Sequence, residues 1–247
     1  MLEIRKQPDG NHPWSKASYE NIYLGEGIRQ TDSFYAWLLK LMLTKPGQRL
    51  LDVSCGEGRL IDLAAHAGVR AYGVDFSEQS LYLARDRSPQ GSFIVADAQE
   101  LPFPSNSFDY VSNIGSLEHY VDPAKGASEI TRVLKADGLA CILLPNLYSL
   151  LDNVWYAFRS GRTFQDNQPI QRYASRYEWQ DLLEANGLFV QRTIKYQREF
   201  PTRWADVLFY LRKPKALARL LVTPCVPLNL AGCFVFLCSK QRDPSVD

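Results

Sequence analysis

The stretch LLDVSCGEGRL, residues 50–60, places a short apolar run directly before a glycine-rich turn and the start of a helix. Leu51 and Val53 are typical of a buried strand, while Gly56 and Gly58 let the backbone approach a ligand closely. The helix that follows would point its free N–H groups at that ligand. This order predicts a strand-turn-helix unit with a binding site at the turn.

The same alternation of strand and helix continues along the chain of 247 residues. We expect strands at 49–54, 69–74, 92–96, 108–113, 139–145, 188–196 and 233–240, and helices at 32–43, 59–67, 77–85, from 122 onward and from 175 to 187. Strands joined by crossover helices form a parallel, doubly wound sheet. The sequence therefore predicts an α/β fold with helices on both faces of one sheet.

Two acidic residues end successive strands after the glycine-rich turn. Asp75 lies 23 residues after Asp52, and Asp97 lies 22 residues after Asp75, so each unit spans about one strand and one helix. A carboxylate at the end of the second strand can accept both hydroxyls of a ribose. A side chain at the end of the third strand can reach an adenine edge. The spacing therefore favours a nucleoside-containing ligand.

The turn does not fit a dinucleotide-binding fingerprint, which requires Gly-x-Gly-x-x-Gly/Ala. Counted from Gly56, the third position is Ile61, and counted from Ser54 it is Arg59, and neither is small. Residues 52–58, DVSCGEG, instead resemble motif I of the class I S-adenosylmethionine-dependent methyltransferases, usually Asp-x-Gly-x-Gly-x-Gly. Ser54 stands at the first glycine of that motif.

The resemblance extends well beyond this motif. It includes GVDFSEQSLYLAR (73–85), VADAQELPFPSNSFDYVSNIGSLEHYVDP (95–123) and EITRVLKADGLACILLPN (129–146), and it is weaker over 175–196 and 233–240. It implies a small-molecule methyltransferase with a Rossmann-like, mostly parallel seven-stranded sheet whose last strand is antiparallel. It also implies S-adenosylmethionine as cofactor and S-adenosylhomocysteine as product.

The resemblance also implies which residues bind the cofactor. Asp52, Ser54, Cys55, Gly56 and Gly58 would surround the methionine part, Asp75 would hold the ribose, Phe76 would lie against the adenine, Asp97 and Ala98 would lie at the adenine amine, and Asn113 and Ile114 would face the methionyl amine and the sulfonium. Serine at position 54 is small and can donate a hydrogen bond to the ligand's carboxylate. We expect it to alter cofactor affinity modestly.

The segments divide into one methyltransferase domain over residues 1–247. We expect an N-terminal helical cap at 1–48, the cofactor-binding core at 49–146, substrate-side insertions at 147–174 and 197–231, and segments that complete the sheet at 175–196 and 232–240. The substrate half of this fold lies in the cap and the insertions.

His119 is the candidate general base, because it is the one histidine at the carboxyl end of a strand. Two alternatives remain for it: a wall of the cofactor pocket, or a metal ligand together with Glu118. No cluster of cysteine and histidine has the spacing of a metal site, so we expect no metal.

Aromatic residues in the first insertion and in the cap predict a pocket for a small or amphiphilic acceptor. Trp155 and Tyr173 would line one side of it, and Tyr19 and Tyr23 would close the other. An anionic acceptor is an option, since residues 192–219 carry eight basic groups against two acids. Each ring can equally belong to the ordinary core.

The basic, amphipathic stretch at 203–221 has three interpretations: recognition of an anionic acceptor, peripheral contact with an anionic membrane, or a solvated helix face. The net charge of +1 argues against a nucleic-acid partner. The uncharged run 220–239 contains two prolines, so a transmembrane helix is not expected. Five cysteines without a CxxC pair and no signal segment predict a cytoplasmic protein with free thiols.

Three rival functions stay open at this point. The chain could be a non-catalytic S-adenosylmethionine-binding subunit, a nicotinamide or nucleotide-sugar enzyme on the same fold, or a membrane-surface methyltransferase with a lipid-linked acceptor. Sequence does not distinguish among oxygen, nitrogen and carbon nucleophiles, and it does not give the oligomeric state.

Overall fold

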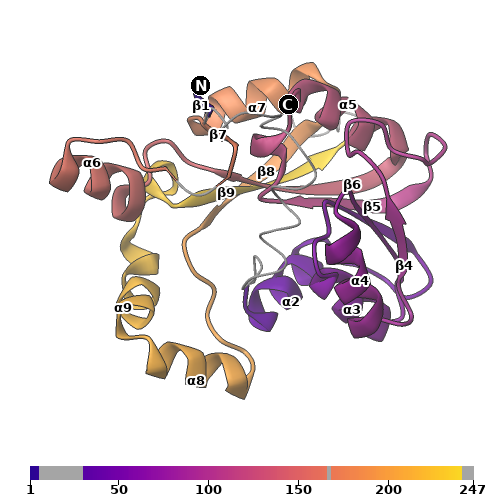
Figure 1. Ribbon diagram of the computed structural model, residues 1–247, viewed down its shortest axis with the longest axis horizontal. Helices are drawn as coiled ribbons and strands as arrows, with labels where there is room; N and C mark the ends of the chain where they lie inside the picture. Colours follow the sequence, from indigo (N-terminus) through magenta and orange to yellow (C-terminus); the bar gives the residue numbers. More distant parts are fainter. Residues whose placement is uncertain (6–29, 166–167, 241–247) are drawn as a thin grey trace.

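The computed structural model describes residues 1–5, 30–165 and 168–240. Its centre is a sheet of seven strands in the order β4-β3-β2-β5-β6-β9-β8 (Figure 1). The strands are β2 (Arg49–Val53), β3 (Arg70–Asp75), β4 (Ser92–Val95), β5 (Phe108–Ile114), β6 (Leu134–Pro145), β8 (Phe189–Tyr196) and β9 (Cys233–Ser239). Strand β9 runs antiparallel to both of its neighbours, and the other pairs are parallel. The expected mixed sheet is confirmed.

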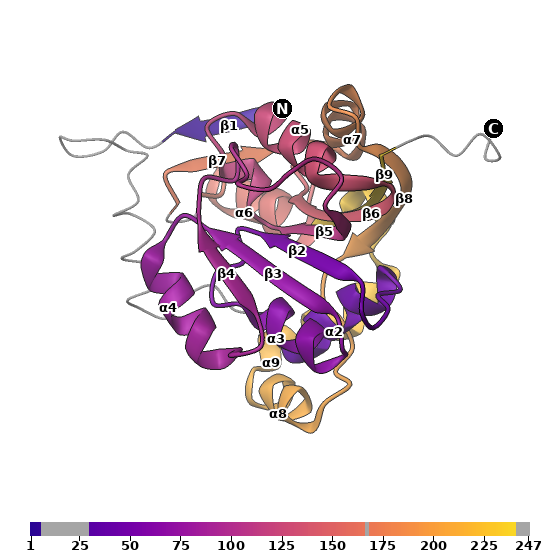
Figure 2. The same cartoon turned by 90° about the vertical axis from the view of Figure 1, so that its right-hand side faces the viewer.

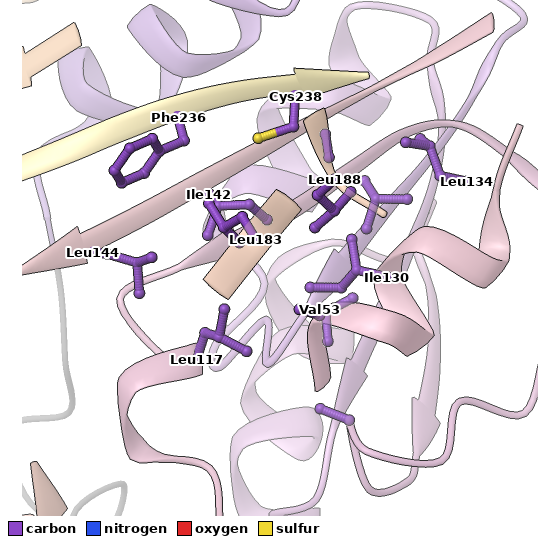
Figure 3. Close-up of a cluster of buried hydrophobic side chains, with 14 of the residues drawn as sticks. Val53, Leu117, Ile130, Leu134, Ile142, Leu144, Leu183, Leu188, Phe236 and Cys238 are labelled. Carbon is purple, nitrogen blue, oxygen red and sulfur yellow. The ribbon is translucent and has the colours of Figure 1, made fainter. Parts of the chain in front are cut away.

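Helices cover both faces of this sheet (Figures 1 and 2). One face carries α2 (Asp32–Leu41), α3 (Arg59–His66) and α4 (Glu78–Arg87), and the other carries α5 (Pro123–Val133) and α7 (Arg176–Ala185). Figure 3 shows the core under α5 and α7, where Ile130 and Leu183 pack against the buried face of β6. These two layers hold the sheet rigid, so that the loops at its edge have fixed positions.

Side-chain caps set where the helices begin. Asp122 accepts hydrogen bonds from the backbone of Ala124 and Lys125 at the start of α5, and Pro123 follows it. Ser175 and Glu178 form a capping box at the start of α7. Both helices therefore begin at the positions that the sequence predicts.

The order of the strands creates the binding edge. From β2 the chain winds outward to β3 and β4, and it then crosses back to β5 on the other side of β2. In a doubly wound sheet, the loops after two strands that lead away from each other leave a crevice at the carboxyl edge. Residues after β2 and β5 therefore face one another across this crevice.

The two expected insertions form separate elements. The first contains η2 (Leu150–Val154), α6 (Trp155–Ser160) and β7 (Ile170–Tyr173), and the second contains α8 (Trp204–Arg212), α9 (Pro214–Val222), η3 (Thr223–Cys225) and η4 (Leu228–Leu230). Helices α6, α9 and α8 project beyond the sheet on one side of the molecule (Figure 1). Helix α8 ends at Arg212, and α9 begins at Pro214.

The N-terminal segment corrects one expectation. Residues expected within a helical cap form strand β1 (Leu2–Arg5), which pairs antiparallel with β7. Of the residues described within 1–48, only α2 forms the expected helix. The short strand is stabilised by its partner, because Glu3 lies opposite Arg172 in the register and forms an ion pair with it at 2.7 Å. A pairing across so many residues leaves no local sequence signal.

The uncharged run 220–239 does not form one helix. Helix α9 ends at Val222, two short turns follow, and β9 begins at Cys233. Among the described residues, none of the helices is long and apolar enough to cross a membrane. All five cysteines are free thiols.

Candidate active site

The turn after β2 has the backbone geometry that its glycines indicate. Gly56 and Gly58 have φ angles of 51° and 70°, in the left-handed region, and Ser54 also lies there at 62°. A side chain on Gly58 would place its Cβ 2.9 Å from the Cβ of Ala84 on α4. The turn is therefore tightly packed from behind, and its front is left for a ligand.

Asp75, at the end of β3, is fixed by this turn. One carboxylate oxygen accepts a hydrogen bond from the backbone of Gly56, and the other accepts one from the backbone of Ser77, both at 2.9 Å. Burial raises the pKa of Asp75, and these backbone donors oppose the rise. The carboxylate lies at the end of β3 on the wall of a cavity, where it can meet the hydroxyls of a diol.

Asp52, at the end of β2, is a buried acid with little compensation. The hydroxyl of Ser112 donates to it at 2.7 Å. Burial raises the pKa of Asp52 to about 7, and the nearby charge of Asp75 adds to the rise. A carboxylate in this position is stabilised when a cation lies next to it. It therefore marks where the crevice accepts positive charge.

A hydroxyl network joins the loops after β2 and β5. Asn113 donates from Nδ2 to the hydroxyl oxygen of Tyr120 at 2.7 Å, and the same hydroxyl lies 2.7 Å from Oγ of Ser54. Either hydroxyl can be the donor in the bond between Tyr120 and Ser54, so the network couples Ser54 to the loop after β5 without fixing where its proton points.

Two cavities lie on either side of this network. The first, of about 220 Å³, is lined by residues that include Asp75, Phe76, Asp97, Ala98, Gln99 and His119. The second, of about 400 Å³, is lined by residues that include Phe34, Tyr35, Asp52, Ile114, Leu143 and Tyr196. Ser54, Gly115 and Ser116 line both, so the two cavities form one bent crevice along the strand ends.

The second cavity contains balanced charges rather than a cationic surface. Arg59 forms ion pairs with Asp32 and Asp62, and Arg87 pairs with Glu57 at 3.0 Å. None of the eight basic residues of 192–219 is among the described residues that line either cavity. Arg203 of this stretch pairs with the lining residue Asp32 at 2.8 Å, so an anionic acceptor stays a prediction.

Comparisons with known proteins agree with this geometry. A family model described as "Methyltransferase domain" matches residues 51–142. A demethylmenaquinone methyltransferase of Paenarthrobacter aurescens is 30% identical over 182 residues, which cover 64% of this chain and 72% of that protein. The chain belongs to the class I S-adenosylmethionine-dependent methyltransferases.

Two further similar proteins show how much of the chain the similarity covers. A "Probable S-adenosylmethionine-dependent methyltransferase" of Mycolicibacterium smegmatis is 32% identical over 148 residues, or 60% of this chain and 54% of that protein. The chain thus spans about half the length of this curated relative. A Haloferax volcanii methyltransferase, solved in a complex with the Trm112 methyltransferase activator, has a TM-score of 0.65 at 17% identity over 91% of this chain and 98% of that one. That similarity shows the same fold.

The residues that line the crevice fit the cofactor of the methyltransferase family, S-adenosylmethionine. Asp75 offers lone pairs to a ribose, and Phe76 and Ala98 line the same cavity as Asp97. Asp52 offers a buried anion to the positively charged methionine end. Acceptors for a nucleoside and an acceptor for a cation therefore lie in two joined cavities, in the order that this cofactor requires.

Most of the site residues expected of a methyltransferase line the crevice: Asp52, Ser54, Cys55, Gly56, Asp75, Phe76, Asp97, Ala98, Ile114 and His119. Gly58 and Asn113 do not. Gly58 is packed against α4, and Asn113 is buried behind the wall, where it bonds to Val53, Leu117 and Tyr120. Gly58 and Asn113 therefore lie behind the wall of the crevice and support the residues that line it.

Among the described residues, the aromatic side chains expected to line the acceptor pocket are not found in the lining of the crevice. Trp155 lies on the exposed helix α6, and Tyr173 is buried in β7, so neither lines the crevice. Helix α6 projects away from the sheet, and the pairing of β7 with β1 encloses Tyr173. Tyr19 and Tyr23 lie outside the described residues.

His119 lies in the nucleoside half of the methyltransferase crevice. Its Nδ1 lies within hydrogen-bonding distance of the carbonyl oxygen of Ile170, and its Nε2 is 3.7 Å from Glu118. It lines the first cavity and is absent from the lining of the second. No group of three metal-binding side chains occurs in the part of the chain that the structure describes. This placement favours the role of a pocket wall.

Several lining residues were missed by sequence reasoning. Tyr120 follows the recognised Leu-Glu-His and had a local signal, whereas Gln168 to Ile170 and Tyr196 had none. The last two groups come from the insertion and from β8. Their position depends on how distant segments pair.

Proposed function

We propose that this chain transfers a methyl group from S-adenosylmethionine to a small amphiphilic acceptor that carries an apolar ring. The observation that supports the acceptor class most strongly is the lining of the second cavity. Phe34, Tyr35, Leu143 and Tyr196 border it next to Asp52. Aromatic side chains at the border of a cavity suit a ring, and the two cations of this lining, Arg59 and Arg87, are each paired with an acid.

The cofactor supplies an activated methyl group on a sulfonium, so the protein's task is to position the two partners and to exclude water. Asp75 would hold the ribose, and Asp52 would balance the positive charge of the methionine end. With Tyr120 as the donor between the two hydroxyls, Ser54 would donate to the carboxylate of that end. Gly115 lies where the two cavities meet, and its φ of 65° keeps the backbone there without a side chain.

The aromatic wall is held in a fixed orientation by its neighbours. The rings of Phe34 and Tyr196 lie 4.8 Å apart, and Trp37 stacks on Tyr196 at 5.8 Å. The hydroxyl of Tyr196 donates to Glu199 at 2.9 Å. A wall fixed in this way presents ring faces rather than a hydrogen-bonding group, which suits a ring acceptor. The name of the relative from Paenarthrobacter aurescens, demethylmenaquinone methyltransferase, supports an acceptor of this kind.

The test is a transfer assay with radiolabelled S-adenosylmethionine and three acceptors: a short-chain demethylnaphthoquinol, phosphoethanolamine and histamine. We expect product with the naphthoquinol alone. In the Tyr35→Ala variant, the KM for the naphthoquinol should rise about fivefold with little change in the KM for the cofactor, because a lost ring contact costs about 1 kcal/mol. Tyr35→Phe should restore the wild-type value.

Binding of S-adenosylmethionine without transfer to any acceptor would contradict this proposal and favour a non-catalytic subunit. Transfer to phosphoethanolamine alone would contradict the ring acceptor. The His119→Ala variant in the same assay separates its two roles. As a pocket wall, His119 should affect the KM for the cofactor, whereas a base would lower kcat by a factor of about 100 or more.

A further inference from the structure

Helix α6 has no buried face. All six of its residues, Trp155–Ser160, are exposed, with Trp155 at 54% and Phe158 at 80%. The rings of these two residues stack on each other at 5.8 Å, and Arg159 lies over the Trp155 ring. A helix of a globular domain ordinarily buries one apolar stripe. The described chain leaves this aromatic surface uncovered, and exposed apolar patches mark interaction sites.

Helices α8 and α9 lie on the same side of the molecule as α6 and also carry exposed apolar side chains (Figure 1). Trp204 on α8 is 74% exposed, and Leu211 and Leu221 are exposed as well. Arg219 of α9 joins η2, because it forms an ion pair with Asp152 at 2.6 Å and donates to the carbonyl of Leu151 at 2.8 Å. We call η2, α6, α8 and α9, residues 150–160 and 204–222, the outer lobe. In Figure 1 its helices follow one another down one side of the molecule.

The outer lobe is cationic. It carries Arg159, Arg212, Lys213, Lys215 and Arg219 against two acids, Asp152 and Asp206, a net charge of +3. Neither acid is available to a partner. Asp152 pairs with Arg219, and Asp206 is buried where it accepts two hydrogen bonds from Ser33. The remaining basic side chains form no ion pair within the described residues.

We propose that the outer lobe docks the protein on the surface of an anionic phospholipid bilayer. Tryptophan and tyrosine favour the level of the lipid headgroups, and exposed leucines favour the acyl boundary below it. Lysine and arginine are attracted to anionic headgroups. A second copy of this chain would bring an equal positive charge to the same face, which disfavours self-association.

The outer lobe lies close to the acceptor side of the crevice, so docking would affect access of the acceptor. The lobe begins a few residues after Leu143, which lines the second cavity. Docking there would bring the acceptor side of the crevice next to the bilayer, where an amphiphilic acceptor is found. This last step rests on the proposed function, whereas the docking itself does not.

The test is sedimentation of the full chain with vesicles of phosphatidylcholine, alone or with a third of phosphatidylglycerol. We expect binding to the anionic vesicles, weaker binding at high salt, and little binding to the neutral ones. Trp155→Ala/Phe158→Ala should weaken it at least tenfold. Arg212→Ala/Lys213→Ala/Lys215→Ala should weaken it on the order of 100-fold, since each basic residue contributes about fivefold. Neither variant should change the melting temperature or the affinity for S-adenosylmethionine.

Matched controls come from surfaces far from the lobe. Tyr82→Ala removes an equally exposed ring from α4, and Lys40→Ala/Lys45→Ala/Arg70→Ala removes three exposed cations near the opposite edge of the sheet. Both should bind like the wild type. Equal binding by the lobe variants and the controls would overturn the proposal. So would a wild-type dimer that fails to bind vesicles and that Trp155→Ala/Phe158→Ala converts to a monomer. Because no readout is methyl transfer, failure here is distinguishable from failure of the proposed function.

Discussion

Asp52 connects ligand binding to the stability of the ligand-free protein. Its pKa is raised to about 7, chiefly by burial, from an ordinary value near 3.8. The folded protein therefore holds a proton that the unfolded chain releases between about pH 4 and pH 7. Over this range the free energy of unfolding falls as the pH rises, because the folded state binds more protons. Above about pH 7 the buried charge is fully present, and it is relieved when a cation binds.

The Asp52→Asn variant tests this relation. We expect its free energy of unfolding to exceed that of the wild type on the order of 2 kcal/mol at pH 8 and to equal it near pH 4. Its affinity for S-adenosylmethionine should be lower and should no longer rise with pH toward 7. Urea titrations and calorimetry at both pH values measure the two effects.

Asp109 provides the control of opposite sign. Although burial raises its pKa, hydrogen bonds from Lys135 and the backbone of Arg49 outweigh this and lower it. Asp109→Asn should therefore lose stability at pH 8. If Asp52→Asn also loses stability at pH 8, then the acid is satisfied in the ligand-free protein and its proposed role is wrong.

The position of a site residue could be predicted from the sequence where it depends only on the neighbouring strand and helix. Asp52, Asp75 and Asp97 follow strands in regular units, so their place at one sheet edge followed from spacing alone. Ser54 was recognised as a departure from the motif, but its bond to Tyr120 depends on the loop after β5. A hydrogen bond between side chains of two different loops leaves no periodic pattern in the sequence.

At the scale of elements, β7 fixes the loop that borders the nucleoside cavity. Arg172 of β7 is buried and donates to the carbonyls of Glu118, Tyr120 and Val121. Its Nε also forms an ion pair with Glu3 of β1. The small sheet of β1 and β7 thus holds residues 118–121 against the crevice through Arg172 and through the contact of His119 with the carbonyl of Ile170.

The Arg172→Ala variant should loosen this loop. We expect a loss of stability of about 3 kcal/mol, because three carbonyls lose a charged donor, and a decrease of at least tenfold in affinity for S-adenosylhomocysteine. Thermal unfolding and calorimetry measure these effects. Glu3→Gln is the control. Glu3 is about one third exposed, so the loss should stay below about 1 kcal/mol. Equal affinity in wild type and Arg172→Ala would show that β7 does not position the loop.

Elements of the sheet were predictable from sequence, whereas the insertions were not. The strands follow from apolar runs, and Asp122 and Ser175 mark helix starts by caps that act within four residues. Strand β1 depends on a partner more than 160 residues away, and the direction of α6 depends on η2. The aromatic content of the insertion indicated a function, but the rings of α6 face solvent instead of the crevice.

At the scale of the whole molecule, two independent parts meet at the carboxyl edge of the sheet. The rigid core supplies the nucleoside cavity and the buried acids. The outer lobe flanks the acceptor side with an aromatic and cationic surface. The division explains why the charge of the chain is uneven, with a net charge of −4 over residues 1–145 and +5 over residues 146–247.

The claim on which the rest depends is that the crevice binds S-adenosylmethionine at the glycine turn. Calorimetric titration of the wild type, Gly58→Ala and Gly47→Ala tests it most directly. Both glycines have a positive φ, but a Cβ on Gly58 would contact Ala84 at 2.9 Å, while one on Gly47 would meet nothing within 4 Å. We predict saturable binding by the wild type and by Gly47→Ala, and at least tenfold weaker binding by Gly58→Ala. Absence of binding to the folded wild type, or equal affinity in all three proteins, would contradict the claim.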